Sequence, residues 1–196
     1  MLAHPHGRES IETISEPERG GQFKPAPAGF SAGFTRSVHW LRFTLQAPPP
    51  NKQGQREIFL EIHPPYLDDL QIYLSQPQEN GVFEIRQTGD LQPHSAKEYP
   101  YRAFVFQVEF ADASARTAYV RLQTSSSSVM AIRAWEPSHF VAQASREYAL
   151  LGLLVGLFLA ALGANIWQGL WRHEAHYRRF IAYMAAALVN ISTVNG

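Results

Sequence analysis

The side chains that could take part in catalysis are scattered along the chain and form no recognisable catalytic set. The run Ser125–Ser128 has no flanking glycine elbow and is typical of a turn rather than of a serine nucleophile. Asp68 and Asp69 are adjacent, so in a strand they would point to opposite faces, which is the wrong geometry for paired catalytic carboxylates. The chain has no cysteine and no glycine-rich phosphate-binding loop. The sequence therefore predicts no catalytic residue.

Eight histidines raise the question of a metal site. Six of them are spread over the N-terminal segment and the expected strands and turns. Only His173 and His176 have a spacing that would place them on one helix face, and they lie beside an expected membrane surface, where histidines are ordinary. We therefore expect neither a metal nor a cofactor.

A set of aromatic and planar polar side chains fits sugar binding better. Sugars are held by aromatic faces and by planar hydrogen-bonding groups. Trp40 and Arg42 share one face of an expected strand, which makes that face a candidate cleft. The alternative is structural, with Trp40 filling a core and Arg42 paired with Asp69 or Glu61. The candidate ligand-binding residues are Trp40, Arg42, Tyr66, Asp68, Tyr73, Tyr99, Tyr101 and Arg102.

These residues lie in a region whose alternating pattern predicts short β-strands. In SVHWLRFTL, for example, Leu41, Phe43 and Leu45 alternate with Trp40 and Arg42. Further stretches of this kind are REIFLEIHP, LDDLQIYLS, RAFVFQVEF, TAYVRLQTS and VMAIRAWEP. Turn signals such as PPPNKQGQ and QPQENG separate them. Six or seven such strands predict an all-β antiparallel sandwich, and no helical period appears before Ser138.

A long apolar segment follows the strands. The nineteen residues from Tyr148 to Ile166 carry no charge. As a helix they would extend about 28 Å, close to the roughly 30 Å of a bilayer core. Their ten Leu, Ile, Val and Phe residues favour insertion by about 3 to 6 kcal/mol, before the glycines and Asn165 subtract from it. A buried core helix is the alternative, but such a helix usually has a polar position in each turn. We predict a transmembrane helix over residues 148–170, with Trp167 and Trp171 as interfacial anchors.

Small residues recur every four positions in this segment. They would line one helix face and let another helix approach closely, although such residues are also common in membrane spans. The predicted helix-packing residues are Gly152, Gly156, Ala160 and Ala164.

The basic stretch WRHEAHYRRF follows, and its arginines favour a cytoplasmic loop at 171–179, with the N-terminal domain outside. A second apolar run, 180–196, is slightly short for a span, and we interpret it as a truncated second transmembrane helix. Since MLAHPHGRES has no apolar core, either a signal peptide lies upstream or the orientation is reversed, and we favour a signal peptide upstream.

The expected organisation follows from these boundaries. We predict a flexible N-terminal segment at 1–24, a sandwich domain at 25–140 and a connector at 141–147. The first transmembrane helix, the loop and the truncated second helix follow in the ranges given above.

Several stretches, in order and spacing, carry a family resemblance: GFTRSVHWLRFTL, FLEIHPPYLDDLQIYL, TGDLQP, YRAFVFQVEF and YVRLQTSSSSVMAIRAWEPSHF. Residues 25 to 140 resemble the type 2 extracellular domain of bacterial seven-transmembrane receptors with diverse intracellular signalling modules (7TMR-DISM). The resemblance implies a jelly-roll-like periplasmic sandwich, similar to carbohydrate-binding modules. It also implies seven spans and an intracellular output module such as a diguanylate cyclase or a histidine kinase. The present sequence lacks most of those spans and the output module.

The sequence therefore favours a ligand-sensing domain of a receptor in the bacterial inner membrane, with the domain in the periplasm. A carbohydrate or cell-wall fragment, a second copy or a partner receptor would be its partners. Nucleic acid is not expected, because the formal net charge is zero and only 17% of residues are charged. The alternatives are a membrane-tethered glycan-processing enzyme, which needs two carboxylates about 5 to 9.5 Å apart across a cleft, and a non-catalytic assembly domain with an exposed apolar patch.

Overall fold

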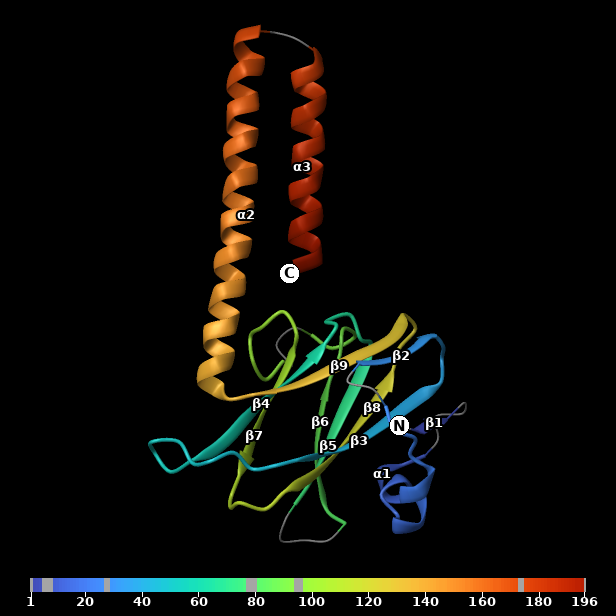
Figure 1. The fold of residues 1–196 in the computed structure, drawn as a ribbon. Coiled ribbons are helices and arrows are strands. Elements are labelled where there is room, and N and C mark those ends of the chain that lie inside the picture. The colour runs from blue at the N-terminus through green and yellow to red at the C-terminus, as the bar shows by residue number, and fades with distance from the viewer. Residues whose placement is uncertain are drawn as a thin grey trace. The chain divides into compact units, whose positions relative to one another are not determined.

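The computed structural model describes residues 2–4, 9–26, 29–76, 81–93, 97–172 and 175–195. The chain divides into two compact units, Met1–Pro137 and Ser138–Gly196. The first unit holds the strands and the second holds two long helices (Figure 1).

The strands of the first unit form two antiparallel sheets. Sheet A has the order β1 (Leu2–His4), β3 (Val38–Leu45), β8 (Arg116–Gln123), β5 (Asp69–Ser75) and β6 (Phe83–Thr88). Sheet B has the order β2 (Gly29–Phe34), β9 (Ser127–Trp135), β4 (Arg56–His63) and β7 (Phe104–Phe110). From β3 to β9 the chain passes repeatedly from one sheet to the other. The prediction of an antiparallel β-sandwich followed by a long apolar helix is confirmed.

Alternation along the strands builds the main core between the sheets. Leu41, Phe43 and Leu45 of β3 pack there, as their spacing predicts. The other core members come mainly from β4, β5, β7 and β8. They include Leu60, Ile62, Leu70, Ile72, Phe104, Phe106, Val120 and Leu122.

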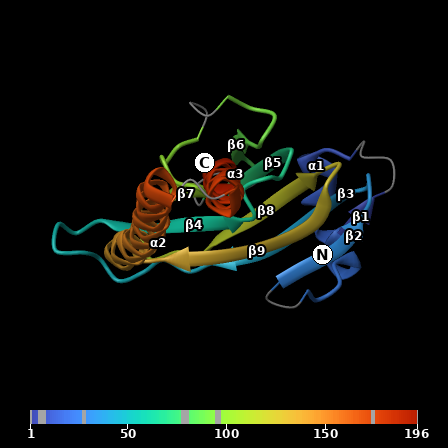
Figure 2. The same cartoon turned by 90° about the horizontal axis from the view of Figure 1, so that it is seen from above.

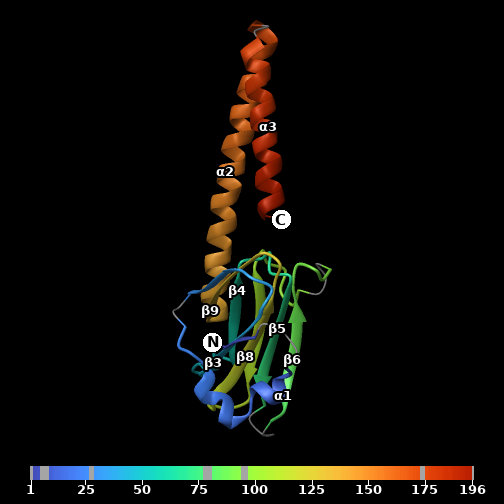
Figure 3. The same ribbon diagram turned by 90° about the vertical axis from the view of Figure 1, so that its right-hand side faces the viewer.

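A second, smaller core covers part of the outer face of sheet A. The helices α1 (Ile11–Ile14) and η1 (Pro17–Gln22, a 3₁₀-helix) lie in the segment expected to be flexible (Figure 3). Ile11 and Ile14 are buried and belong to one apolar cluster with Trp40. The N-terminal elements α1, β1 and β2 lie together at the β3 side of the sandwich (Figure 2). Ile11 and Ile14, in the segment expected to be flexible, are therefore packed against the sheet, and α1 is a short helix that precedes Ser138.

Two arginines close the edge of the sandwich where β6 of sheet A faces β7 of sheet B. Arg86 Nη1 donates to the carbonyl oxygen of Gln107 at 2.6 Å. Arg116 donates from Nη1 to the Glu109 carbonyl at 3.0 Å and from Nε to the Ser75 carbonyl at 2.8 Å. Because Ser75 and Glu109 belong to different sheets, Arg116 ties the sheets together at this edge.

The second unit contains α2 (Pro137–Arg172) and α3 (Ala175–Asn195). The stretch Pro137–Gly169 is long and apolar enough to cross a membrane; its most apolar 18-residue window has a mean hydropathy of 2.3, and none of that window is buried. A core helix of a soluble protein would be mostly buried. The apolar part of α3, Arg179–Asn190, is shorter than a span.

The helix boundaries differ from the expected ones. Helix α2 begins at Pro137, so the expected connector 141–147 is helical. Helix α2 continues to Arg172 and α3 begins at Ala175, so most of the expected loop 171–179 is helical as well. His173, from the expected histidine pair, lies outside the described residues.

Candidate functional site

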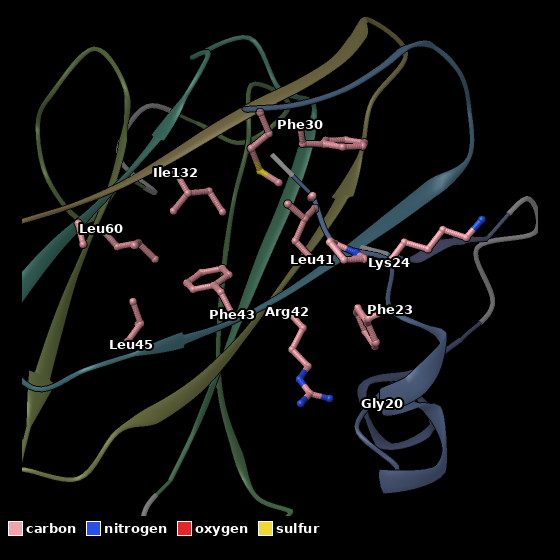
Figure 4. Close-up of a pocket in the computed structure, with 14 residues that line it drawn as sticks. Gly20, Phe23, Lys24, Phe30, Leu41, Arg42, Phe43, Leu45, Leu60 and Ile132 are labelled. Carbon is pink, nitrogen blue, oxygen red and sulfur yellow. The ribbon is translucent and has the colours of Figure 1, made fainter. Parts of the chain in front are cut away.

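A cleft of about 540 Å³ lies between the two sheets, at the edge formed by β3 and β9 (Figure 4). We call it the edge cleft. Its floor is buried and apolar, and Leu41, Phe43 and Ile132 form half-buried walls. The residues that line it are Gly20, Phe23, Lys24, Pro25, Ala26, Phe30, Leu41, Arg42, Phe43, Leu45, Leu60, Met130, Ile132 and Ala134.

The cleft exists because two short strands stop before it. Strand β1 pairs with β3 only from Val38 to Trp40. Strand β2 pairs with β9 only as far as Ala131. In the described chain, the rest of β3 and the end of β9 therefore have no strand on this side, and their inner side chains face an opening instead of a neighbour.

The mouth of the cleft is basic. Arg42 is exposed, and its guanidinium carbon lies 5.9 Å from the centre of the Phe23 ring. It also lies close to Gly20, where an added Cβ would be 3.2 Å from Arg42 Nη1. Lys24 is the other cation in the lining, and its ammonium points away from the cavity (Figure 4). No carboxylate is among the lining residues, so the two-carboxylate chemistry of a glycosidase has no acid or base here.

Asp69 and Glu61, the carboxylates that the structural alternative offered to Arg42, have other partners. Asp69 Oδ2 accepts a hydrogen bond from Arg121 Nη1 at 2.6 Å. Glu61 Oε1 is 2.7 Å from His63 Nε2, and Glu61 Oε2 accepts from Trp135 Nε1 at 2.7 Å. In the described part of the chain, Arg42 therefore pairs with neither of them, and this part of the structural alternative does not hold.

Trp40 and Arg42 share the outer face of β3, as their spacing predicts, but only Arg42 is accessible. The Trp40 side chain is 1% exposed, beneath α1, and its ring centre is 5.4 Å from that of Tyr73. A sugar could not stack on it without displacing the helix. The alternative interpretation of Trp40, a core residue, is the one the structure bears out.

The remaining predicted ligand residues are not brought together. Tyr73 is also buried, which raises the pKa of its hydroxyl, and this hydroxyl donates to Gln71 Oε1 at 2.6 Å. Asp68 accepts hydrogen bonds from the backbone N and the hydroxyl of Ser125, at 2.6 and 2.7 Å, which hold the pKa of the Asp68 carboxyl below its usual value. Tyr66 is exposed.

The last three candidates, Tyr99, Tyr101 and Arg102, lie in the segment just before β7, which is a strand of sheet B. Tyr101 is buried, Arg102 is half-buried, and the Tyr99 ring centre lies 5.2 Å from that of Phe59, on the outer face of sheet B. Of the eight candidates, Arg42 alone lines the edge cleft.

A polar row on the outer face of sheet A was missed by the sequence reasoning. Asp69 Oδ1 accepts from Gln87 Nε2 at 2.9 Å, and Arg121 Nη2 donates to Gln123 Oε1 at 2.7 Å. The row joins β5, β6 and β8, so only their cross-strand register could have revealed it.

A buried carboxylate anchors the end of β9. Glu61 is 4% exposed. Burial alone would raise its pKa, but the hydrogen bonds to His63 and Trp135 outweigh burial, and the pKa of Glu61 is lowered. Since Trp135 is the last residue of β9 and Pro137 begins α2, this contact fixes the strand immediately before the helix.

The small-residue stripe of α2 makes no close contact within the described chain. Gly152, Gly156, Ala160 and Ala164 are all exposed, and a Cβ at either glycine would meet nothing within 4 Å. Packing of this stripe against another helix remains a prediction.

Comparison with known proteins identifies the family of the sandwich. A search of curated proteins gives no match. The family model described as 7TMR-DISM extracellular 2 matches residues 1–136, which include both sheets and the edge cleft. The chain therefore belongs to the 7TMR-DISM extracellular 2 family.

Proposed function

We propose that the sandwich is the ligand-sensing, outward-facing domain of a multi-pass membrane receptor, and that it reports occupancy of the edge cleft through β9 to α2. One observation carries this proposal. Strand β9 lines the cleft with Met130, Ile132 and Ala134, and it is also the strand that leads into α2 at Pro137. A change at the cleft therefore reaches the membrane helix through a few residues of continuous chain.

Such signalling requires that the ligand bind one arrangement of the domain more tightly than another. The open edge supplies the means, because among the described strands the end of β9 pairs with β4 alone. A ligand wedged between β3 and β9 would change the separation of the two strands. The Glu61–Trp135 hydrogen bond would then pass the change to the residue that precedes the helix by two positions.

The wider setting is part of the same proposal. The domain would lie in the periplasm, anchored in a bacterial inner membrane. It would control an output module such as a diguanylate cyclase or histidine kinase. A second copy, or a partner receptor, would pack on the small-residue stripe of α2.

A pair of substitutions in β9 tests the proposal without a ligand. Ala134 is exposed and lines the cleft, so Ala134→Trp would fill the mouth of the cleft and mimic occupancy. Thr44 is exposed too but lies on the outer face of β3 and outside the cleft lining, so Thr44→Trp is the control. We expect A134W, and not T44W, to change amide hydrogen exchange in residues 136–147 of the full chain held in lipid nanodiscs.

Equal exchange in both variants would overturn the coupling between the cleft and α2. That result would favour the alternative of a non-catalytic assembly domain.

A glycan ligand is a second candidate function, supported by the polar row on sheet A. Gln87 and Gln123 are exposed and carry planar amide groups of the kind that bind sugar hydroxyls. Glycan and cell-wall fragments should then raise the unfolding temperature of the full chain, and the double variant Gln87→Ala, Gln123→Ala should lose that shift. A shift that persists in the double variant would place the glycan elsewhere.

A further inference from the structure

We infer that the edge cleft binds a free carboxylic acid with an aliphatic tail, the tail between the sheets and the carboxylate on Arg42. This inference rests on the proposed sensing function and specifies the ligand class of the same site.

The interior of the cleft suits an apolar body. Its floor and walls are Phe, Leu, Met and Ile side chains, and its volume of about 540 Å³ falls within the range of small-molecule sites. A sugar placed here would bury hydroxyl groups against these side chains without hydrogen-bond partners, which is unfavourable. An aliphatic chain loses no hydrogen bonds on entering.

The mouth of the cleft suits one negative charge. Arg42 and Lys24 are the cations among the lining residues, which include no carboxylate; the Arg42 side chain extends beside Phe23 and Gly20, whereas the Lys24 ammonium points away (Figure 4). A planar guanidinium can hold a carboxylate through two parallel hydrogen bonds. A phosphate monoester carries nearly two negative charges, and the Arg42 guanidinium would match only one of them. A monocarboxylate is therefore the anion that fits.

The neighbours of Arg42 leave its polar edge available. The Phe23 ring packs near the guanidinium, and Gly20 places no side chain beside it. Because no carboxylate in the described chain neutralises Arg42, a ligand carboxylate would not have to displace one.

The test uses the full chain in nanodiscs of zwitterionic lipid. The probe is decanoate with a photoreactive diazirine in its tail, and the crosslinked peptides are mapped by mass spectrometry. We expect crosslinks within residues 41–45 and 130–134. Unlabelled decanoate should compete with the probe at least tenfold better than decanol, which has the same tail without the charge.

Two variants isolate the charge. Arg42→Gln should weaken competition by decanoate about tenfold and leave competition by decanol unchanged. Arg36→Gln removes the same charge from an exposed position outside the cleft and should change neither.

Several results would overturn the inference: crosslinks confined to α2 and α3, equal competition by decanol and decanoate, or equal effects of R42Q and R36Q. Failure of the ligand assignment is distinguishable from failure of the sensing function, because the comparison of A134W with T44W involves no ligand.

Discussion

The imidazole of His39 is buried next to the Phe30 ring, and it makes the stability of the domain sensitive to pH. The side chain is 3% exposed, and neither ring nitrogen has a hydrogen-bond partner among the described residues. Burial disfavours the charged ring and lowers the pKa of His39 below its ordinary value of 6.5. The unfolded chain therefore takes up a proton at a higher pH than the folded chain does. Stability from this residue is present above about pH 6.5 and decreases as pH falls toward the lowered pKa.

We expect the unfolding temperature to decrease between about pH 7 and pH 5.5, and His39→Phe to remove that decrease. The carboxyl groups with lowered pKa values, such as Glu61 and Asp68, lose their contribution only below about pH 4.5. They do not obscure this window. An unchanged pH profile in H39F would contradict the role of His39.

The sequence predicted the faces of single residues better than their accessibility. Alternation placed Trp40 and Arg42 together correctly. What buries Trp40 is α1, a four-residue helix with too few residues to show a helical period. The alternating strand pattern alone could not reveal that α1 packs over Trp40.

Among the elements, β6 shows why some strands escaped prediction. Its Glu84 and Arg86 pair with Leu74 and Ile72 of β5, so charged side chains occupy the positions that would normally be apolar. They do so because they help to close an edge of the sandwich. Strand β2, GFSAGF, has one buried residue, Phe30, and gives no alternating signal. The edge cleft depends on where β1 and β2 end, which no pattern in the sequence specifies.

Arg116 should be the main polar link between the sheets at the closed edge. It is buried and donates to carbonyl oxygens of both β5 and β7. Arg116→Met would remove the hydrogen-bond donor from these two carbonyl oxygens and from Glu84 Oε2. We therefore expect this substitution to lower the free energy of unfolding by about 2 to 3 kcal/mol. Urea unfolding of the full chain in nanodiscs, followed by tryptophan fluorescence, measures this.

Arg36→Met, at an exposed site, is the control and should change stability by no more than about 0.5 kcal/mol. If R116M were as mild as R36M, the link across the closed edge would be unimportant.

At the scale of the whole molecule, the exposed apolar surface of α2 is the feature that makes this helix a candidate membrane span. Leu150, Leu153, Leu157 and Trp167 are each more than half exposed. A Leu157→Arg substitution near the middle of the span should disfavour insertion by about 3 to 4 kcal/mol, whereas Leu157→Ala should cost far less. Carbonate extraction of membranes from expressing cells measures the difference. Equal retention of both variants would argue against α2 as a span.

Sensing by this domain depends on communication between the edge cleft and α2. The most direct measurement is amide hydrogen exchange of residues 136–147 in the full chain, in nanodiscs, with and without saturating decanoate. We expect decanoate to change exchange there in the same direction as Ala134→Trp, and we expect the Arg42→Gln variant to require about tenfold more decanoate for the same change. Decanoate that crosslinks in the cleft while exchange in residues 136–147 stays the same would contradict this communication.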